Sequence, residues 1–353
     1  MSAKYLLLAS ELRTLCARLQ QQGVGRLPGE EALCVRYGCS RQTVRHALDV
    51  LEAEGLVLRM RGSGTYLAGG IPLRSLSIAV LAAGWDEYLY PRLLRDLKSG
   101  FAAAGLRTEA FATGGRSLRE REILSELLER PPAGILLEPV NSALPSLNLD
   151  LLRQLSIKEI PLVWLRSALP EPQHAPVVTE DNEGGARMLV RYLLNKGHRD
   201  IAGIFRHDDR SGHERYLGFL SELMSSALPA EDRVLWYGRN ELEAVLDGDM
   251  EPLLRFIRGR LRPCSAAVCH NDRIAEPLIR CLLQAGLRVP EDIAVVSFDN
   301  SPLCRLAPVP ITSLSHARQH LGDAAVRTMT GLLRGRSPHK EVLGWTLRER
   351  QSG

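Results

Sequence analysis

The first residues that could do chemistry are four polar side chains near residue 45: Arg41, Gln42, Arg45 and His46. Apolar residues repeat at helical spacing through the same segment, at Val44, Ala47, Leu48 and Leu51. In a helix this pattern turns the apolar side chains inward and the four polar ones outward. Arginine can bind guanine or a phosphate, and glutamine can bond adenine with two hydrogen bonds. The pattern predicts a helix that reads DNA, although a solvated helix face would look the same.

A second candidate site is a set of polar and aromatic residues that follow predicted strands in the rest of the chain. They are Trp85, Asp86, Tyr90, Glu138, Trp164, Arg166, Asp181, Arg206, His207, Asp208, Asp209, Asn271, Asp272, Asp299, Asn300 and His316. Ligands of open α/β sheets bind beyond the carboxyl ends of the strands. Carboxylates, amides and guanidinium groups bond several hydroxyls at once, and aromatic rings can cover a sugar face. The set predicts a polyol site, although each member could instead cap a helix or form a surface ion pair.

Two earlier helices and a following hairpin would position the DNA-reading helix. The apolar pattern predicts helices over 5–22 and 28–37, and Ser40 is placed to cap a third helix that ends before Gly55. Strands over 56–60 and 65–67, joined by the turn 61–64, would then form a wing with a basic tip. The order of these elements predicts a winged helix-turn-helix.

The residues expected to contact DNA come from the start of the second helix, the third helix and the wing. They are Glu30, Ser40, Arg41, Gln42, Thr43, Arg45, His46, Arg61, Gly62, Ser63, Gly64 and Thr65. Residues 1–68 hold nine Lys/Arg against six Asp/Glu, a net charge of 9 − 6 = +3. This charge permits binding to double-stranded DNA without proving it.

The remainder of the chain alternates strand-like and helix-like segments, which is typical of parallel sheets covered by helices. Strands are predicted over 76–82, 107–112, 134–137, 161–165, 176–179, 200–205, 265–269 and 292–298. The predicted fold class is therefore α/β, with a DNA-binding domain over 1–68, a linker over 69–75 and a two-lobed ligand-sensing domain over 76–353. Lobe 1 is expected to comprise about 76–174 and 301–325, and lobe 2 about 175–300 and 326–353.

Composition narrows the classes of function. The chain has 353 residues, of which 45% are hydrophobic and 24% charged, as in ordinary soluble proteins. No stretch suits a membrane span or a signal peptide, so we expect a cytoplasmic protein with no membrane partner. The seven cysteines show no metal-ligand spacing, and we expect no metal, no cofactor and no catalytic residue. Phosphate-binding and hydrolase motifs are missing from the sequence, which disfavours an enzyme.

The N-terminal motifs resemble the GntR family of winged-helix regulators. The matching stretches are Leu27-Pro28-Gly29-Glu30, Ser40-Arg41-Gln42-Thr43-Val44-Arg45, and Arg61-Gly62-Ser63-Gly64-Thr65. This resemblance implies a DNA-binding transcription regulator.

The later motifs resemble the LacI and periplasmic-binding-protein sensor fold. They include Asn195-x-Gly197-His198-Arg199, Arg215-x-x-Gly218-Phe219, Cys269-His270-Asn271-Asp272 and Ser297-Phe298-Asp299. Ligand positions of that family carry over to Arg215, Asp272 and Asp299, with Asn271 as a neighbour. The resemblance implies two lobes that close on a small molecule.

The combination of both domains is similar to the arabinose-responsive repressors. Leu137-Glu138-Pro139 and Gly203-Ile204-Phe205-x-x-Asp208-Asp209 also match that group. The resemblance implies a repressor of sugar-utilisation genes, released from operator DNA by L-arabinose or a related pentose. We also expect a homodimer, because each chain supplies one recognition helix and a two-fold pair would match a palindromic operator. The residues expected to bind this effector are Tyr90, Glu138, Trp164, Arg206, Asp208, Arg215, Asn271, Asp272, Asp299 and His316.

Several alternatives remain open at this stage. The same architecture could take an effector that is not a pentose, or could bind DNA more tightly when its ligand is present. An enzyme that processes a sugar and an exported sugar-binding protein are less favoured alternatives. The residues 1–68 would serve no purpose in the exported protein.

Overall fold

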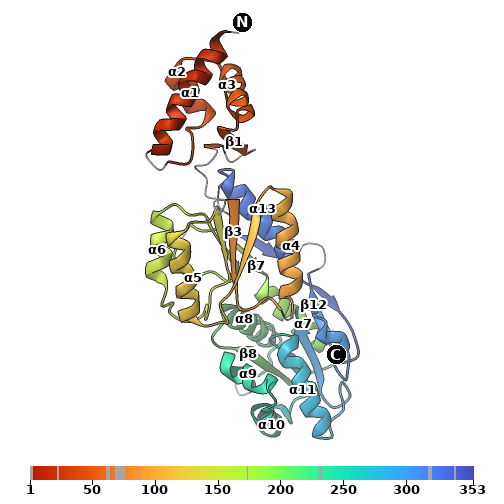
Figure 1. The fold of residues 1–353 in the computed structure, drawn as a ribbon. Helices are drawn as coiled ribbons and strands as arrows, with labels where there is room; N and C mark the ends of the chain where they lie inside the picture. The colour runs from red at the N-terminus through yellow and green to blue at the C-terminus, as the bar shows by residue number, and fades with distance from the viewer. Residues whose placement is uncertain are drawn as a thin grey trace.

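A computed structural model describes residues 3–21, 24–60, 64–67, 76–86, 88–172, 174–229, 233–316, 320–337 and 339–353. The predicted winged helix-turn-helix is present in the N-terminal region (Figure 1). Its elements are α1 (Ala3–Gln21), α2 (Glu30–Tyr37), α3 (Arg41–Ala53), β1 (Val57–Met60) and β2 (Gly64–Leu67). The two strands pair antiparallel, with Arg59 opposite Thr65.

Local chemistry explains the turn before α3. Gly38 ends α2 in the left-handed conformation, with φ 60° and ψ 37°, which glycine adopts without steric cost. Ser40 then accepts a hydrogen bond from the backbone N–H of Thr43 and caps α3. Apolar side chains of α1 and α3 form the small core of this domain, including Leu12, Leu48 and others. The turn and this core fix the direction of α3.

The rest of the chain forms two lobes, each built on a six-stranded sheet (Figure 1). Lobe 1 contains β3 (Ser77–Ala82), α4 (Tyr90–Ala103), β4 (Arg107–Ala112), α5 (Ser117–Glu129), β5 (Gly134–Leu137), α6 (Leu149–Ile157), β6 (Leu162–Arg166), β7 (Val177–Glu180), α13 (Leu321–Leu333) and β13 (Glu341–Leu343). Its sheet has the order β13-β7-β6-β5-β3-β4, and all of its pairs are parallel.

Lobe 2 contains α7 (Asn182–Asn195), β8 (Ile201–Arg206), α8 (Arg210–Ser225), β9 (Val234–Tyr237), α9 (Arg239–Leu246), α10 (Glu251–Phe256), β10 (Ala266–Cys269), α11 (Asp272–Gln284), β11 (Ala294–Phe298), α12 (Leu303–Leu306), β12 (Thr312–Ser315) and β14 (Thr346–Arg348). A π-helical turn over Ile257–Leu261 follows α10. The sheet order is β14-β12-β11-β10-β8-β9, and only β14 runs antiparallel to its neighbour. The α/β fold class is confirmed.

The division between the lobes differs from the predicted one. Strand β7, predicted for lobe 2, pairs with β6 in lobe 1, and β12, predicted for lobe 1, pairs with β11 in lobe 2. Helix α13 packs on α4, and β13 pairs with β7, so the segment from α13 to β13 also belongs to lobe 1. The chain thus crosses from one lobe to the other three times: after β7, after β12 and after β13. Apolar patterning identifies a strand, but the sheet it joins depends on pairing with distant residues.

Each of the eight predicted strands has a counterpart in the structure, with ends that differ by two residues at most. Four short strands, β9, β12, β13 and β14, were missed. β13 and β14 have three residues each, too few for a clear alternating pattern. β9 and β12 have four residues, the same length as β5, β7 and β10, which were predicted. Within the described residues, no helix is long and apolar enough to cross a membrane.

Candidate nucleic-acid interface and effector pocket

Helix α3 presents the predicted DNA-reading face. Arg41, Gln42, Arg45 and His46 are exposed, while the apolar residues of the opposite face are buried in the domain core. The His46 ring packs edge-on against Tyr5 of α1, with ring centroids 6.0 Å apart. The exposed face begins at the N-terminal end of α3, where a recognition helix contacts base edges.

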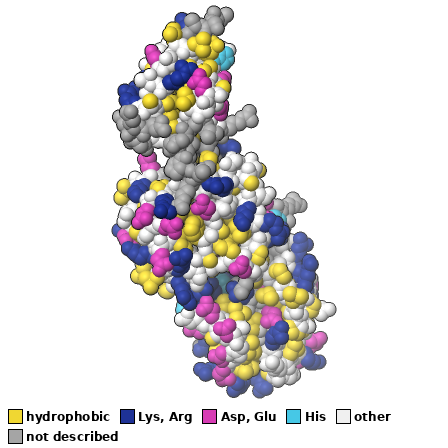
Figure 2. All heavy atoms as spheres, in the orientation of Figure 1, with side chains coloured by type: hydrophobic (Ala, Val, Ile, Leu, Met, Phe, Trp, Pro, Cys, Tyr) yellow, Lys and Arg dark blue, Asp and Glu magenta, His cyan; other side chains and the backbone are white. Residues whose placement is uncertain are grey.

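Carboxylates of α2 contact the arginines of α3. Arg45 Nε lies 2.9 Å from Glu30 Oε2, and Arg41 forms an ion pair with Glu31. Glu30 also lies 3.6 Å from Arg59 of β1. The side chain of Glu30 therefore orients two arginines. Acidic and basic side chains lie interspersed on the face of this domain seen in Figure 2.

The other predicted DNA contacts divide into three groups. The hydroxyl of Ser40 caps α3 and also lies 2.9 Å from the hydroxyl of Thr43, so both side chains have a local structural use. Thr65 is buried, which makes a side-chain contact with DNA wrong for this residue. Arg61, Gly62 and Ser63 lie outside the described residues, and Gly64 begins β2.

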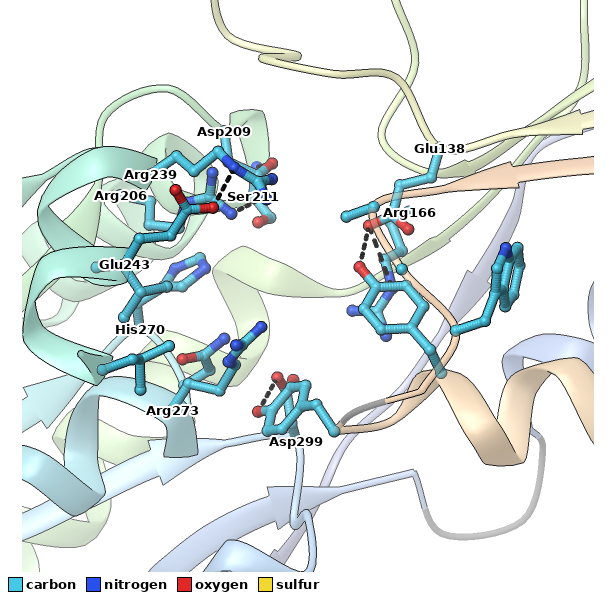
Figure 3. Close-up of a pocket in the computed structure, with 18 of the residues that line it drawn as sticks. Glu138, Arg166, Arg206, Asp209, Ser211, Arg239, Glu243, His270, Arg273 and Asp299 are labelled. Carbon is cyan, nitrogen blue, oxygen red and sulfur yellow. Dashed lines mark hydrogen bonds and ion pairs between the residues drawn. The ribbon is translucent and has the colours of Figure 1, made fainter. Parts of the chain in front are cut away.

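A pocket of about 530 Å³ lies between the lobes, at the carboxyl ends of their strands. Figure 3 shows Glu138 and Arg166 of lobe 1 on one side, facing Arg206, Asp209, Arg239 and His270 of lobe 2. The structure brings together six of the ten predicted effector residues: Tyr90, Glu138, Arg206, Arg215, Asn271 and Asp299. Residues more than 200 positions apart thus share one cavity, as expected for side chains that follow the carboxyl ends of parallel strands.

The other four predicted effector residues do not line this pocket. Trp164 is wrong as a ligand contact, because β6 turns its ring into the apolar core of lobe 1. Asp272 is completely buried and accepts hydrogen bonds from Ser297, Ser313 and the Ser301 backbone.

Asp208 and His316 also have partners within the protein. Asp208 lies 2.7 Å from Arg206 and accepts a hydrogen bond from the backbone N–H of Arg239, so it supports the pocket from behind. His316 contacts Glu180 and Trp345. Position after a strand identified the correct edge of the sheet, but not which side chains turn into the cavity.

Several pocket residues were missed by the sequence analysis. Tyr88 lies in the loop after β3, and Glu180 ends β7 as the last strand residue. Arg239, Leu242 and Leu246 come from α9, which follows the missed strand β9. Arg239 comes two residues after the end of β9, so a prediction of this strand would have identified it as a candidate ligand residue.

The lobe 1 side of the pocket is a cluster of three polar side chains. The Tyr90 hydroxyl donates to Glu138 Oε1 over 3.1 Å, and Arg166 Nε lies 3.8 Å from the same oxygen. Burial and nearby carboxylates raise the pKa of Glu138, although Arg166 opposes this shift. Arg166 has φ 63°, an uncommon backbone conformation for a residue with a side chain, as is often seen at ligand sites.

The lobe 2 side is organised around Arg215. Its guanidinium lies 3.4 Å from Glu180 and 3.6 Å from Asp299, and it covers the Phe298 ring at 4.1 Å. Burial by itself would raise the pKa of Glu180, but Arg166, His316 and Arg215 lower it well below its usual range. Glu180 therefore stays ionised inside the protein, where a lone carboxylate would be costly.

Hydrogen bonds join the two lobes directly. The Tyr88 hydroxyl donates to Asp299 Oδ2 over 2.5 Å. On another side of the cleft, the Ser142 hydroxyl donates to Asp209 Oδ1 over 3.0 Å and accepts from the Arg210 backbone over 2.9 Å. These contacts hold the lobes together around the pocket.

A second group of contacts connects the pocket to the lobe crossings. Glu180 ends β7 at the first crossing, His316 follows β12 at the second, and Trp345 follows β13 at the third. His316 Nε2 lies 3.1 Å from Glu180 Oε1, and the His316 ring stacks on Trp345 with centroids 4.1 Å apart. Because Glu180 also lines the pocket, a bound molecule can influence all three crossings through it.

The charges of the pocket suit a neutral ligand with many hydroxyls. Arg166, Arg206, Arg215 and Arg239 each form an ion pair with a protein carboxylate. Their positive charge is therefore already balanced, which disfavours a phosphate ligand. Six buried polar atoms of residues that line the pocket make no hydrogen bond with the described residues: Trp85 Nε1, Glu138 Oε2, Arg166 Nε, His270 Nδ1, Asn271 Oδ1 and Asp299 Oδ1. Buried polar atoms require partners, and hydroxyls can both donate and accept. No group of described residues could hold a metal ion.

Comparison with known proteins supports both domains. Residues 9–67 match the bacterial regulatory proteins of the gntR family, and residues 190–353 match the periplasmic binding protein-like domain. An arabinose metabolism transcriptional repressor of Geobacillus stearothermophilus is 30% identical over 342 residues, which are 96% of this chain and 93% of that protein. The protein of the same name from Halalkalibacterium halodurans is 28% identical, over 85% of this chain and 82% of its own.

A solved structure supports the sensor fold. A putative ribose operon repressor from Burkholderia thailandensis has a TM-score of 0.67 at 23% identity, and the match covers 78% of this chain and 99% of that one. The relatives are transcription regulators and not enzymes, which removes the enzyme alternative. Because the likeness to the Geobacillus stearothermophilus repressor spans both domains, this protein belongs to the family of transcriptional repressors that join a GntR-type DNA-binding domain to a periplasmic-binding-protein-like sensor domain.

Proposed function

We propose that this repressor controls sugar-utilisation genes and releases its operator when L-arabinose or a related pentose enters the pocket. The observation that carries the proposal is the set of buried polar atoms, on both sides of the cleft, that make no hydrogen bond with the described residues. Glu138 and Asp299 offer acceptors from opposite lobes, so a small polyol that bonds both would stabilise the closed arrangement. The names of the two relatives favour arabinose over other sugars.

The proposed assembly is a homodimer that acts in the cytoplasm. Each chain supplies a single copy of α3, and two copies related by a two-fold axis would match a palindromic operator. Release requires the pentose to bind the DNA-incompetent arrangement more tightly than the competent one. The cluster of Glu180, His316 and Trp345 at the lobe crossings is placed to carry this change.

Titration calorimetry on the full chain tests the effector. L-arabinose, its mirror image D-arabinose, D-xylose and D-ribose are each titrated into the protein. We expect saturable heat with L-arabinose and at least tenfold weaker binding of D-arabinose, because a pocket with fixed donors and acceptors discriminates mirror images. Absence of binding by all four sugars to folded protein would contradict the pentose proposal.

A matched pair of variants assigns the binding to this pocket. Glu138→Gln removes a buried charged acceptor and should weaken sugar binding by about tenfold or more. Glu122→Gln changes an exposed carboxylate of α5 and should leave the affinity unchanged. Equal effects of the two substitutions would place the sugar elsewhere.

Fluorescence anisotropy then tests the direction of the response. A labelled operator duplex, selected from a random library by the protein itself, is titrated at fixed salt with and without L-arabinose. We expect the sugar to weaken operator binding. Tighter binding in the presence of the sugar would establish a ligand-promoted repressor and overturn the proposed release.

A further inference from the structure

The N-terminal end of α2 carries an acidic residue, Glu31, to which the proposed function gives no role. Glu31 stands one residue into α2, and its carboxylate forms an ion pair with Arg41. Both side chains are open to solvent, with 79% of the Glu31 side chain and 66% of the Arg41 side chain exposed. Arg41 is the first residue of α3, at the end that faces base edges in a recognition helix. Glu31 therefore lies beside the face that DNA must approach.

The neighbouring residue Glu30 differs from Glu31 in its number of partners. Glu30 contacts Arg45 and Arg59, which come from different elements, and its side chain is only 32% exposed. Loss of one arginine to DNA would leave Glu30 with the other. The ion pair recorded for Glu31 is with Arg41 alone. Any DNA contact by Arg41 would therefore leave the Glu31 carboxylate facing phosphates without that compensation.

The ion pair between Arg41 and Glu31 is weak enough for DNA phosphates to replace the carboxylate. An exposed ion pair contributes only about 0–1 kcal/mol, so a duplex with its dense negative charge can take Arg41 from Glu31. The exchange leaves an unpaired carboxylate beside the DNA-facing end of α3, where each nearby phosphate repels it by about 1 kcal/mol or less in water. The cost does not depend on base sequence, because it arises from the phosphate charge.

We propose that Glu31 is an affinity-limiting residue of the DNA-binding domain, which competes with DNA for Arg41 and repels the phosphates once displaced. Its effect is to weaken binding to every duplex by a similar factor. Binding to non-operator DNA, which depends almost wholly on phosphate charge, is thereby kept low. Occupancy of an operator then requires the additional base contacts of α3.

The test is substitution of Glu31 in the full chain without effector. Binding of wild-type protein and of Glu31→Gln to a fluorescein-labelled 30-base-pair duplex of random sequence is measured by anisotropy from about 50 to 300 mM KCl. We expect the variant to bind about three- to tenfold more tightly at the lowest salt. The slope of log K against log salt should steepen by up to about 0.9, the value for one phosphate contact.

Glu54→Gln is the matched control, because it changes net charge equally within the same domain. Glu54 forms an exposed pair with Arg13 beyond the other end of α3. At about 1.5 Å per residue this position is roughly 20 Å from Arg41, well beyond the screening length of about 10 Å at 0.1 M salt. We expect less than a twofold change in affinity. Thermal unfolding and circular dichroism check that both variants retain their fold.

Three results would overturn the proposal. Unchanged affinity and slope for Glu31→Gln would show that the carboxylate does not act on DNA. Weaker binding would show that Glu31 holds Arg41 in a productive position. An equal gain from Glu54→Gln would show that only net charge matters. Since the probe is a random duplex, none of these results depends on the identity of the effector.

Discussion

Arg41 of α3 and Arg215 of α8 each form an ion pair with a glutamate, but the first pair is exposed to solvent and the second is buried. Arg41 and Glu31 pair on the surface, whereas only 2% of each side chain is exposed in the pair of Arg215 and Glu180. Exposed pairs are weak and screened by salt, so α3 can exchange carboxylates for phosphates. Removal of one member of a buried pair leaves an uncompensated charge, so Arg215 is fixed in place. The difference indicates that the DNA-binding domain uses replaceable contacts and the sensor uses permanent ones.

The largest expected effect comes from the buried arginine. Arg215→Met should lower the free energy of unfolding of the sensor domain by about 3–5 kcal/mol, because buried Asp299 would lose its ion pair with Arg215 and Glu180 would keep only Arg166 and His316. Urea unfolding followed by tryptophan fluorescence measures the change. Arg210→Met, on the same helix, changes a side chain that is 54% exposed and pairs with the half-buried Glu214, and should change stability by less than about 0.5 kcal/mol. Similar losses from both variants would remove the proposed contrast between exposed and buried pairs.

A second large effect concerns Asp272, a buried carboxyl group that forms no ion pair with the residues that the structure describes. Burial and the nearby Asp299 raise the pKa of Asp272 to about 6. The folded protein therefore holds a proton here that the unfolded chain, with a pKa near 3.9, releases. Stability from this group is complete below about pH 4 and is lost as the pH rises through about 6, by up to about 3 kcal/mol.

Asp272→Asn isolates this contribution, because the amide keeps the shape without the charge. Urea unfolding at pH 4 and pH 7 should show wild type losing stability relative to the variant as the pH rises. Other carboxyl groups cancel in this difference. A difference that stays constant between the two pH values would show that Asp272 does not titrate in this range.

Substitution of Arg45, an exposed arginine of α3, should weaken DNA binding without lowering the stability of the protein. Arg45→Ala removes a candidate base contact and should weaken binding to the selected operator by at least tenfold, since one good base contact contributes about 1–3 kcal/mol of discrimination. Unfolding should change little, because the pair with Glu30 is at the surface. Calorimetry with L-arabinose should give wild-type affinity. Loss of both DNA and sugar binding would contradict the separation of the two domains.

The smallest effect is expected from the loss of one hydroxyl group, that of Ser142, which joins the two lobes across the cleft. Ser142→Ala removes hydrogen bonds to Asp209 and to the Arg210 backbone, which join lobe 1 to lobe 2. A hydrogen bond to a charged group contributes about 1.5–3 kcal/mol. Asp209 keeps its contacts with Arg206 and the Ser211 backbone, so only part of this energy is lost and sugar affinity should fall by about two- to tenfold. Ser225→Ala, in the last turn of α8, is a control within lobe 2. An unchanged sugar affinity for Ser142→Ala would show that this contact does not stabilise the closed arrangement.

The DNA-binding domain was predicted closely because its signals are local. Helical spacing of Val44, Ala47, Leu48 and Leu51, a serine cap and a glycine turn lie within a few residues of the structure they specify. These signals placed the exposed face of α3 correctly. Thr65 was predicted wrongly, since its burial depends on packing of the wing against the rest of the domain.

The sequence by itself determined the winged helix-turn-helix, eight of the twelve strands that the structure describes in the two lobes, and the edge of the sheets where polar residues gather. Tertiary structure alone decided which sheet receives β7, β12 and β13, and therefore where the chain crosses between the lobes. It also decided that Trp164 enters the core while Tyr88 and Arg239 enter the pocket. Alternation along a strand is a property of neighbouring residues, whereas strand partners and the direction of a side chain depend on residues that folding brings together from distant parts of the chain.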